Sequence, residues 1–255
     1  MLLLRRVMTV GFARAYGWPD TTLEGALMRS RKATGRLVGV LYLLLGIPNA
    51  LSLNHFPRRF LIPNDPVTTA ANIESGAMLF RLWAFLDVIA GVVSIWMAIE
   101  LYRLLKDVHR DWARFLVGVV FVMAAMSFAI TIIQLAPLTI LNGSSTWAPF
   151  DRAQLESLAY GFITLRGQAV GAISVYWGVW LVPLAVLIYR SGFLPKLLGI
   201  VLGLAAGGYL VSAVVFFVAP DSYRTVFWAT APIYGIGEIS FLLYMLIKGA
   251  RTEED

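Results

Sequence analysis

The sequence lacks cysteine altogether and has only two histidines, His55 and His109, among its 255 residues. Without cysteine there is no disulfide framework, no iron–sulfur cluster and no thiolate site for zinc. Charged residues are scarce at 14%, whereas a soluble domain carries about 25%. Apolar residues reach 59%, which excludes a disordered chain and exceeds what one water-soluble core needs. The composition therefore indicates a protein that crosses a membrane several times.

Six apolar segments are long enough to cross a bilayer, whose hydrocarbon core of about 30 Å requires roughly 20 residues of helix. They are continuously apolar rather than short and alternating, which favours helices over the strands of a barrel. The predicted fold is all-α, an integral membrane bundle of six transmembrane helices in one domain, residues 29–255. The six segments are residues 35–53, 76–102, 113–141, 168–189, 193–218 and 226–248.

Basic residues flank these segments unequally, which predicts the orientation of the bundle. Twelve lysines and arginines lie on the side of the two termini, and five lie on the other side. Since the more basic side faces the cytoplasm, both termini are expected inside, in agreement with an even number of spans. The net charge of +6 is then explained by topology and by contacts with anionic lipid, so the bilayer is an expected partner and nucleic acid is not.

The segments outside the spans give three further predictions. Residues 1–28, drawn as a helix, place Leu3, Leu4 and Val7 opposite Arg5, which predicts an amphipathic interfacial helix, with a flexible tail as the alternative. The first outer loop, residues 54–75, is long and is expected to fold over the outer mouth of the bundle. In the second, residues 142–167, Asp151 is expected to cap a short interfacial helix over residues 151–160.

Small residues in the fifth segment predict a close helix contact. Gly199, Gly203 and Gly207 recur at four-residue spacing, which lets two helix backbones approach each other. Packing inside the bundle is one interpretation, and a homo-oligomer seam is the other.

Charges inside the hydrocarbon region are costly and point to candidate functional residues. Asp87 and Glu238 are each expected near the middle of the bilayer, and Arg81 is expected in its outer third. With other polar groups of the outer half they predict a polar pocket that opens to the outside. The predicted ligand-binding set is Asp87, Glu238, Arg81, Arg166, Gln134, Asn49 and Tyr234.

Two interpretations of these charges remain open. In the structural one, Asp87 and Glu238 are satisfied by Arg81, by Arg166 or by backbone groups, and fix how the helices pack. In the functional one, they bind a cation, a proton or a polar headgroup. For the two arginines the alternatives are extension to the outer headgroups and a cap over an anionic group in the pocket.

Familiar catalytic motifs are absent from the sequence. There is no His-Glu-x-x-His zinc motif, no Gly-x-Ser-x-Gly nucleophile turn and no phosphate-binding loop. We therefore predict no catalytic residues, no metal and no cofactor. The leading functional hypothesis is binding or transport of a small molecule, ion or lipid-like ligand. The alternatives are a non-catalytic membrane partner and an intramembrane lipid-modifying enzyme that uses Asp87 or Glu238 as acid or base.

Several short motifs, in their order along the chain, resemble a known family. Arg31-Lys32-Ala33-Thr34-Gly35-Arg36-Leu37-Val38-Gly39 is similar to its opening, and Glu100-Leu101-Tyr102-Arg103 and Gly192-Phe193-Leu194-Pro195-Lys196 fit later positions. The family is the bacterial membrane family filed as domain of unknown function 4386, and the likeness covers roughly residues 30–249. It implies a multi-pass protein of the bacterial cytoplasmic (inner) membrane and brings no known activity.

Overall fold

The computed structural model describes residues 31–251, and these are almost entirely helical. Six of the helices are long and apolar enough to cross a membrane, which confirms the predicted membrane fold for this part of the chain. The predicted N-terminal interfacial segment lies outside the described residues. The elements are α3 (Arg31–Ala50), the π-helical turn η1 (Leu51–His55), α4 (Phe56–Phe60), α5 (Pro66–Ser75), α6 (Ala77–Leu105), α7 (Arg110–Leu141), the short helix η2 (Ser145–Trp147), α8 (Arg152–Arg190), α9 (Lys196–Val218) and α10 (Pro220–Ile247).

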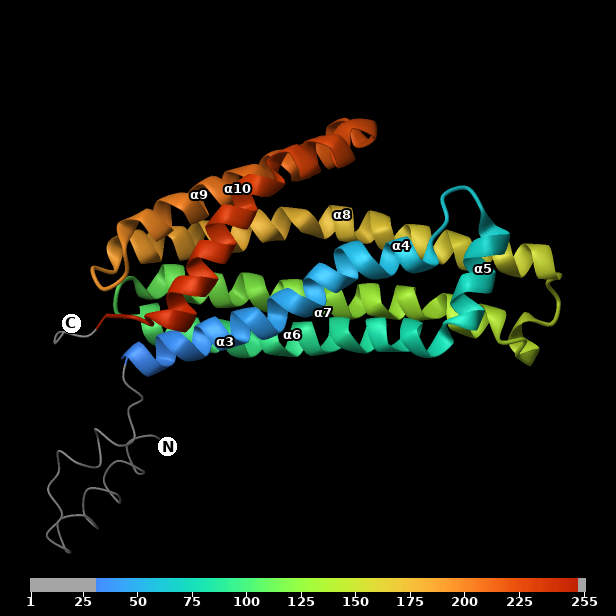
Figure 1. Ribbon diagram of the computed structural model, residues 1–255, viewed down its shortest axis with the longest axis horizontal. Helices are drawn as coiled ribbons and strands as arrows, with labels where there is room; N and C mark the ends of the chain where they lie inside the picture. Colours follow the sequence, from blue (N-terminus) through green and yellow to red (C-terminus); the bar gives the residue numbers. More distant parts are fainter. Residues whose placement is uncertain (1–30, 252–255) are drawn as a thin grey trace, which may run out of the picture.

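The long helices form a ring, seen from the side in Figure 1. Each packs mainly on its two neighbours in the order α3, α6, α7, α8, α9 and α10, and α10 returns to α3. Glycines permit the closest of these approaches. A Cβ built on Gly39 of α3 would collide with the backbone of Leu246, and one on Gly237 of α10 would lie 2.8 Å from the carbonyl oxygen of Val201. The side chains inside the ring thus face a common centre.

Two helices are longer than their apolar segments predict. The first span continues from α3 through η1 into α4 as one 30-residue helix. Pro48 lies inside α3 and removes one backbone donor, but the helix does not end there. The predicted interfacial helix over residues 151–160 does not stop but runs on as α8, of 39 residues. Its start is as expected, since Asp151 and Gln154 form a reciprocal capping box.

The two ends of the bundle differ. One end holds the first and last described residues and the turns that join α6 to α7 and α8 to α9. At the other end, α4, α5 and the start of α8 enclose an apolar cluster that includes Phe56, Phe60, Phe80 and Trp83. This agrees with the expectation that residues 54–75 fold over that end. Figure 1 also shows that the α9–α10 hairpin stops short of the ends of α6, α7 and α8.

Candidate functional site

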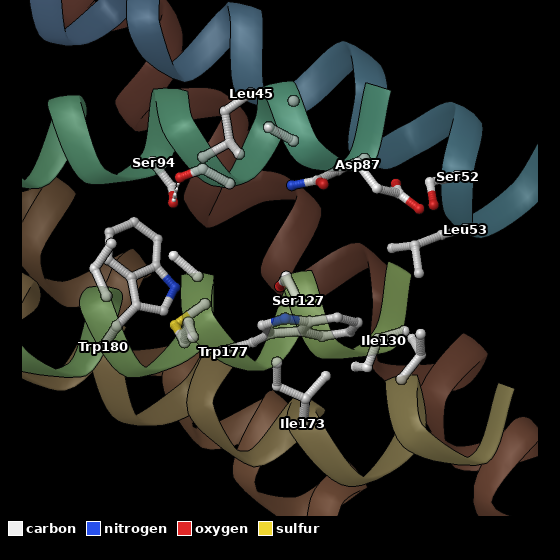
Figure 2. A pocket seen from close by; sticks show the side chains of 18 of the residues that line it. Leu45, Ser52, Leu53, Asp87, Ser94, Ser127, Ile130, Ile173, Trp177 and Trp180 are labelled. Carbon is white, nitrogen blue, oxygen red and sulfur yellow. Dashed lines mark hydrogen bonds between the residues drawn. The ribbon is translucent and has the colours of Figure 1, made fainter. Parts of the chain in front are cut away.

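A cavity of about 290 Å³ lies inside the ring and is lined by all six long helices. On four of them the lining residues recur every three or four positions, which is the spacing of one side of a helix. On α6 these residues are Asp87, Ala90, Gly91, Ser94 and Met97. Figure 2 shows Trp177 and Trp180 reaching into the cavity from α8, while Asp87 and Ser52 lie together on the opposite wall.

At the end of the cavity toward α4, a buried arginine connects four parts of the bundle. Arg166 on α8 donates a hydrogen bond from Nε to Gln134 Oε1 of α7 at 2.7 Å. Its Nη2 donates to Ser52 Oγ of η1 at 2.8 Å and to Asp87 Oδ2 of α6 at 3.1 Å. The Arg166 and Asp87 side chains are only 6% and 13% exposed, so they form a buried ion pair whose charges cancel.

Aromatic rings separate this ion pair from α5. The Arg166 guanidinium lies 4.2 Å from the centre of the Trp83 ring, and the Trp83 indole donates to Ser52 Oγ at 2.8 Å. Trp83 in turn stacks on Phe56 and Phe60, with ring centres 5.5 and 6.1 Å away. The end of the cavity that was expected to open outward is therefore covered by aromatic side chains.

At the other end of the cavity, Glu238 of α10 is held by two phenols. Tyr42 Oη of α3 donates to Glu238 Oε2, and Tyr209 Oη of α9 donates to Glu238 Oε1, both at 2.6 Å. When Glu238 is ionised, each oxygen accepts one of these bonds and can accept one further bond. Within residues 31–251, no lysine or arginine forms an ion pair with Glu238.

Aromatic rings surround the carboxylate. Tyr42 packs against Trp180 with ring centres 6.1 Å apart, and Tyr209 meets Trp177 edge to face at 5.6 Å. Tyr234 stacks on Tyr209 at 4.1 Å. The site therefore combines one acidic group with several electron-rich ring faces.

The two acidic groups lie in the same cavity but at different depths. Tyr42, which binds Glu238, and Ser52, which lies beside Asp87, are ten residues apart on one continuous helix. At 1.5 Å per residue, this separates the two polar centres by about 15 Å along the bundle. A shared proton between Asp87 and Glu238 is therefore ruled out by distance. From the sequence, both acids are predicted near mid-bilayer because the depth of each acid is measured from the start of its own helix. These starts lie at different heights, because the α9–α10 hairpin stops short of α6.

The remaining predicted residues are placed as follows. Asn49 lines the cavity at an exposed position of α3. Gln134 is buried behind Arg166, and its Nε2 is the one buried side-chain nitrogen or oxygen atom in the described chain without a hydrogen-bond partner. Tyr234 supports the ring of Tyr209. Arg81 is exposed on α6 and does not line the cavity, so the structure does not bring it together with the others.

The three predicted packing glycines of α9 differ in their surroundings. A Cβ on Gly199 would lie 2.8 Å from both the carbonyl oxygen of Ala185 and the amide nitrogen of Tyr189, so Gly199 packs against α8. Gly203 and Gly207 are exposed, and a Cβ on Gly207 would meet no atom within 4 Å. Bundle packing thus accounts for one of the three positions.

Several residues of the site are not in the predicted set. Tyr42, Ser52, Trp177 and Trp180 lie in helices that are apolar on every side, so the sequence gives no signal for the inward face. Tyr42, Ser52 and Tyr209 are polar groups inside a span, and that signal could have identified them. Within the described part of the chain, no group of three or more acidic or histidine side chains could hold a metal ion.

Comparison with known proteins gives a family and a partial relative. A family model described as domain of unknown function, DUF4386, matches residues 37–249, in agreement with the resemblance in the sequence motifs. An uncharacterized protein of Archaeoglobus fulgidus is 29% identical over 82 residues, which cover 31% of this chain and 46% of that protein. No solved structure matches the chain.

Proposed function

The chain belongs to the DUF4386 family, and from this premise we propose that it is a membrane protein that binds a small ligand in the cavity between its six helices, as a carrier or a receptor. The observation that carries the proposal is the surroundings of the Glu238 carboxyl. It lines a cavity inside the ring, no cation among the described residues pairs with it, and two tyrosines hold it in one position.

The contrast with Asp87 supports this assignment of roles. Asp87 is neutralised by Arg166, and the pair connects α6 to α8 next to a closed aromatic cluster. Such a pair fits the structural interpretation, in which a charge inside a membrane is satisfied by a partner and fixes the packing. Glu238 has phenols instead of a cation, which leaves a negative charge for a ligand. The function therefore depends on Glu238, whereas Asp87 and Arg166 maintain the shape of the cavity.

We further propose the cytoplasmic (inner) membrane of a bacterium as the location, with both termini inside. The end of the bundle that holds Arg31 and Arg251 also holds most of the basic residues that flank the spans. At about 34 Å, α9 is close to the thickness of a hydrocarbon core, whereas α8, at about 58 Å, must extend beyond it. Glu238 then lies in the hydrocarbon region, and the cap formed by α4 and α5 lies outside it.

The test is native mass spectrometry of the protein released gently from membranes. We expect a discrete bound mass in the wild type that is lost in Glu238→Gln. The matched control is Gly207→Leu, a substitution on the outer surface of the ring that leaves the cavity unchanged. Thermal unfolding of each variant establishes that the fold is kept.

Two results would contradict the proposal. One is a wild-type protein that carries no discrete mass beyond annular lipids that Glu238→Gln carries equally. The other is a bound mass that survives in Glu238→Gln at wild-type occupancy. Loss of stability in Glu238→Gln comparable to that of an Arg166 variant would assign Glu238 to packing instead.

A further inference from the structure

The charges that line the cavity do not balance. Asp87 and Arg166 neutralise each other, and Glu238 in its ionised form adds one further negative charge. A buried charge without a counter-charge is costly inside a membrane, and a ligand of one positive charge would remove that cost. A singly charged cation therefore complements this cavity better than an anion or a neutral molecule does.

The side chains near Glu238 favour an organic cation over a metal ion. Metal ions such as Ca²⁺ require six or more oxygen ligands, and Glu238 is here the single carboxylate. The neighbouring cavity walls are instead formed by the rings of Tyr42, Trp177, Trp180 and Tyr209. Aromatic faces attract ammonium groups, and tryptophan does so most strongly. A carboxylate among such rings suits an amine or a quaternary ammonium group.

The opening of the cavity indicates how such a ligand reaches it. Contacts that join α3 to α10 include Gly39 against Leu246 and Tyr42 against Glu238 and Phe241. Further along α3, Asn49 and Leu53 line the cavity and are exposed.

Gly46 marks the same opening. It lines the cavity, and a Cβ built on it would meet no atom within 4 Å. Phe227 lines the cavity from α10. The seam between α3 and α10 is therefore closed at Tyr42, and beyond Tyr42 the cavity reaches exposed positions of α3.

We infer that the ligand is a lipophilic organic cation that enters from the bilayer between α3 and α10 and places its cationic group against Glu238 among the rings of Trp177 and Trp180. This inference rests on the proposed function and specifies its ligand class. The largely apolar lining beyond these groups fits the hydrocarbon part of such a molecule.

Binding of a chosen probe tests the ligand class. Benzyltrimethylammonium is a small aromatic cation, and neopentylbenzene is its neutral carbon analogue of nearly the same shape. We expect equilibrium dialysis against the protein in lipid nanodiscs to show saturable binding of labelled benzyltrimethylammonium, with empty nanodiscs as the blank. Neopentylbenzene should not displace it. Glu238→Gln should weaken binding by about tenfold or more, because the cationic group of the probe then has no anionic partner.

A matched pair of variants tests the route. Gly46→Trp places an indole in the opening, and Gly207→Trp places the same indole on the outer surface of α9, where a Cβ likewise meets no atom within 4 Å. We expect Gly46→Trp to slow association of the probe by about tenfold or more, because the indole obstructs the route. Gly207→Trp should bind at the wild-type rate.

The outcomes separate this inference from the proposed function. If the wild type does not bind benzyltrimethylammonium, or if neopentylbenzene displaces it equally well, the ligand class is wrong. A native bound mass that is neutral or anionic and still depends on Glu238 would overturn the class and leave the proposed function standing. Wild-type association in Gly46→Trp would overturn the route between α3 and α10.

Discussion

Arg166 reaches Asp87 across the inside of the ring, with Nη2 and Oδ2 3.1 Å apart, although α7 lies between their helices in the order of packing. The same guanidinium holds Gln134 on that intervening helix and Ser52 on η1. One side chain therefore fixes the relative positions of four helical segments. The stability of the bundle should depend on this arginine more than on any single apolar contact.

We predict that Arg166→Met destabilises the protein by about 3–5 kcal/mol, because it leaves the Asp87 carboxylate buried without a partner. The measurement is reversible unfolding in mixed micelles, followed by tryptophan fluorescence. Arg166→Lys should also be destabilising, since a lysine cannot replace both the Nε bond to Gln134 and the stacking on Trp83.

The double variant Asp87→Leu/Arg166→Met supplies the control. Removing both charges leaves no unpaired ion, so we expect most of the lost stability to return. If the double variant is as unstable as the sum of the two single variants, the two side chains do not act as a pair.

The seam between α3 and α10 should be sensitive to a single methyl group. Gly39→Ala would place a Cβ against the backbone of Leu246, and overpacking of this kind costs about 1–3 kcal/mol. Gly46→Ala, two helical turns along α3, meets no atom within 4 Å and should be neutral or stabilising by up to about 1 kcal/mol. Thermal unfolding of the two variants side by side measures the difference. Equal melting temperatures would mean that this seam is not closely packed.

The sequence was sufficient for the class of fold, and the reason is physical. Backbone groups in hydrocarbon must be hydrogen-bonded within the chain, so long apolar segments become helices. It was not sufficient for the ends of the helices. The fourth apolar segment begins near Gln168, yet α8 begins at Arg152, because a capping box starts it and one side of its first turns packs on α5.

The same limitation applies to the site. Polarity inside or beside a span identified Asp87, Glu238 and Arg166 as residues that need an explanation, and all three line the cavity. The roles of Tyr42 and Ser52 depend on which face of α3 points inward, and a helix that is apolar on all sides carries no such signal. Their positions follow from the packing of α3 against α10 and α6.

The outer cap should respond to pH through Glu74 of α5. Arg152 of α8 donates two hydrogen bonds to Glu74, each 2.7 Å long, and these bonds lower the pKa of the Glu74 carboxyl despite some burial. A carboxyl with a lowered pKa in the folded state stabilises that state above its unfolded pKa. This stabilisation disappears as the pH falls through the lowered value.

We therefore predict that Glu74→Gln speeds hydrogen exchange of the α5 amides at pH 7, and that this effect decreases as the pH falls below the ordinary pKa of a glutamate. The pair is partly exposed, so solvent screening limits its contribution to at most about 1 kcal/mol, which is a change in exchange of up to about fivefold. Asp111→Asn, which removes an exposed ion pair at the start of α7, is the control and should leave α5 unchanged. An effect of Glu74→Gln that persists unchanged at pH 3 would show that charge is not its cause.

The glycines of α9 separate packing within one chain from assembly of several chains. Gly199→Leu would drive a side chain into the backbone of α8 at Ala185 and Tyr189, so we expect it to lower the unfolding free energy by more than about 3 kcal/mol. Gly203→Leu adds a side chain at an exposed position and should change that free energy by no more than about 0.5 kcal/mol.

Because Gly203 makes no close contact within one chain, a substitution at this position tests a homo-oligomer alone. If such an assembly uses this face, light scattering of Gly203→Leu in detergent will show the monomer, with the melting temperature of the wild type. An oligomer that survives Gly203→Leu unchanged would exclude this face as its seam.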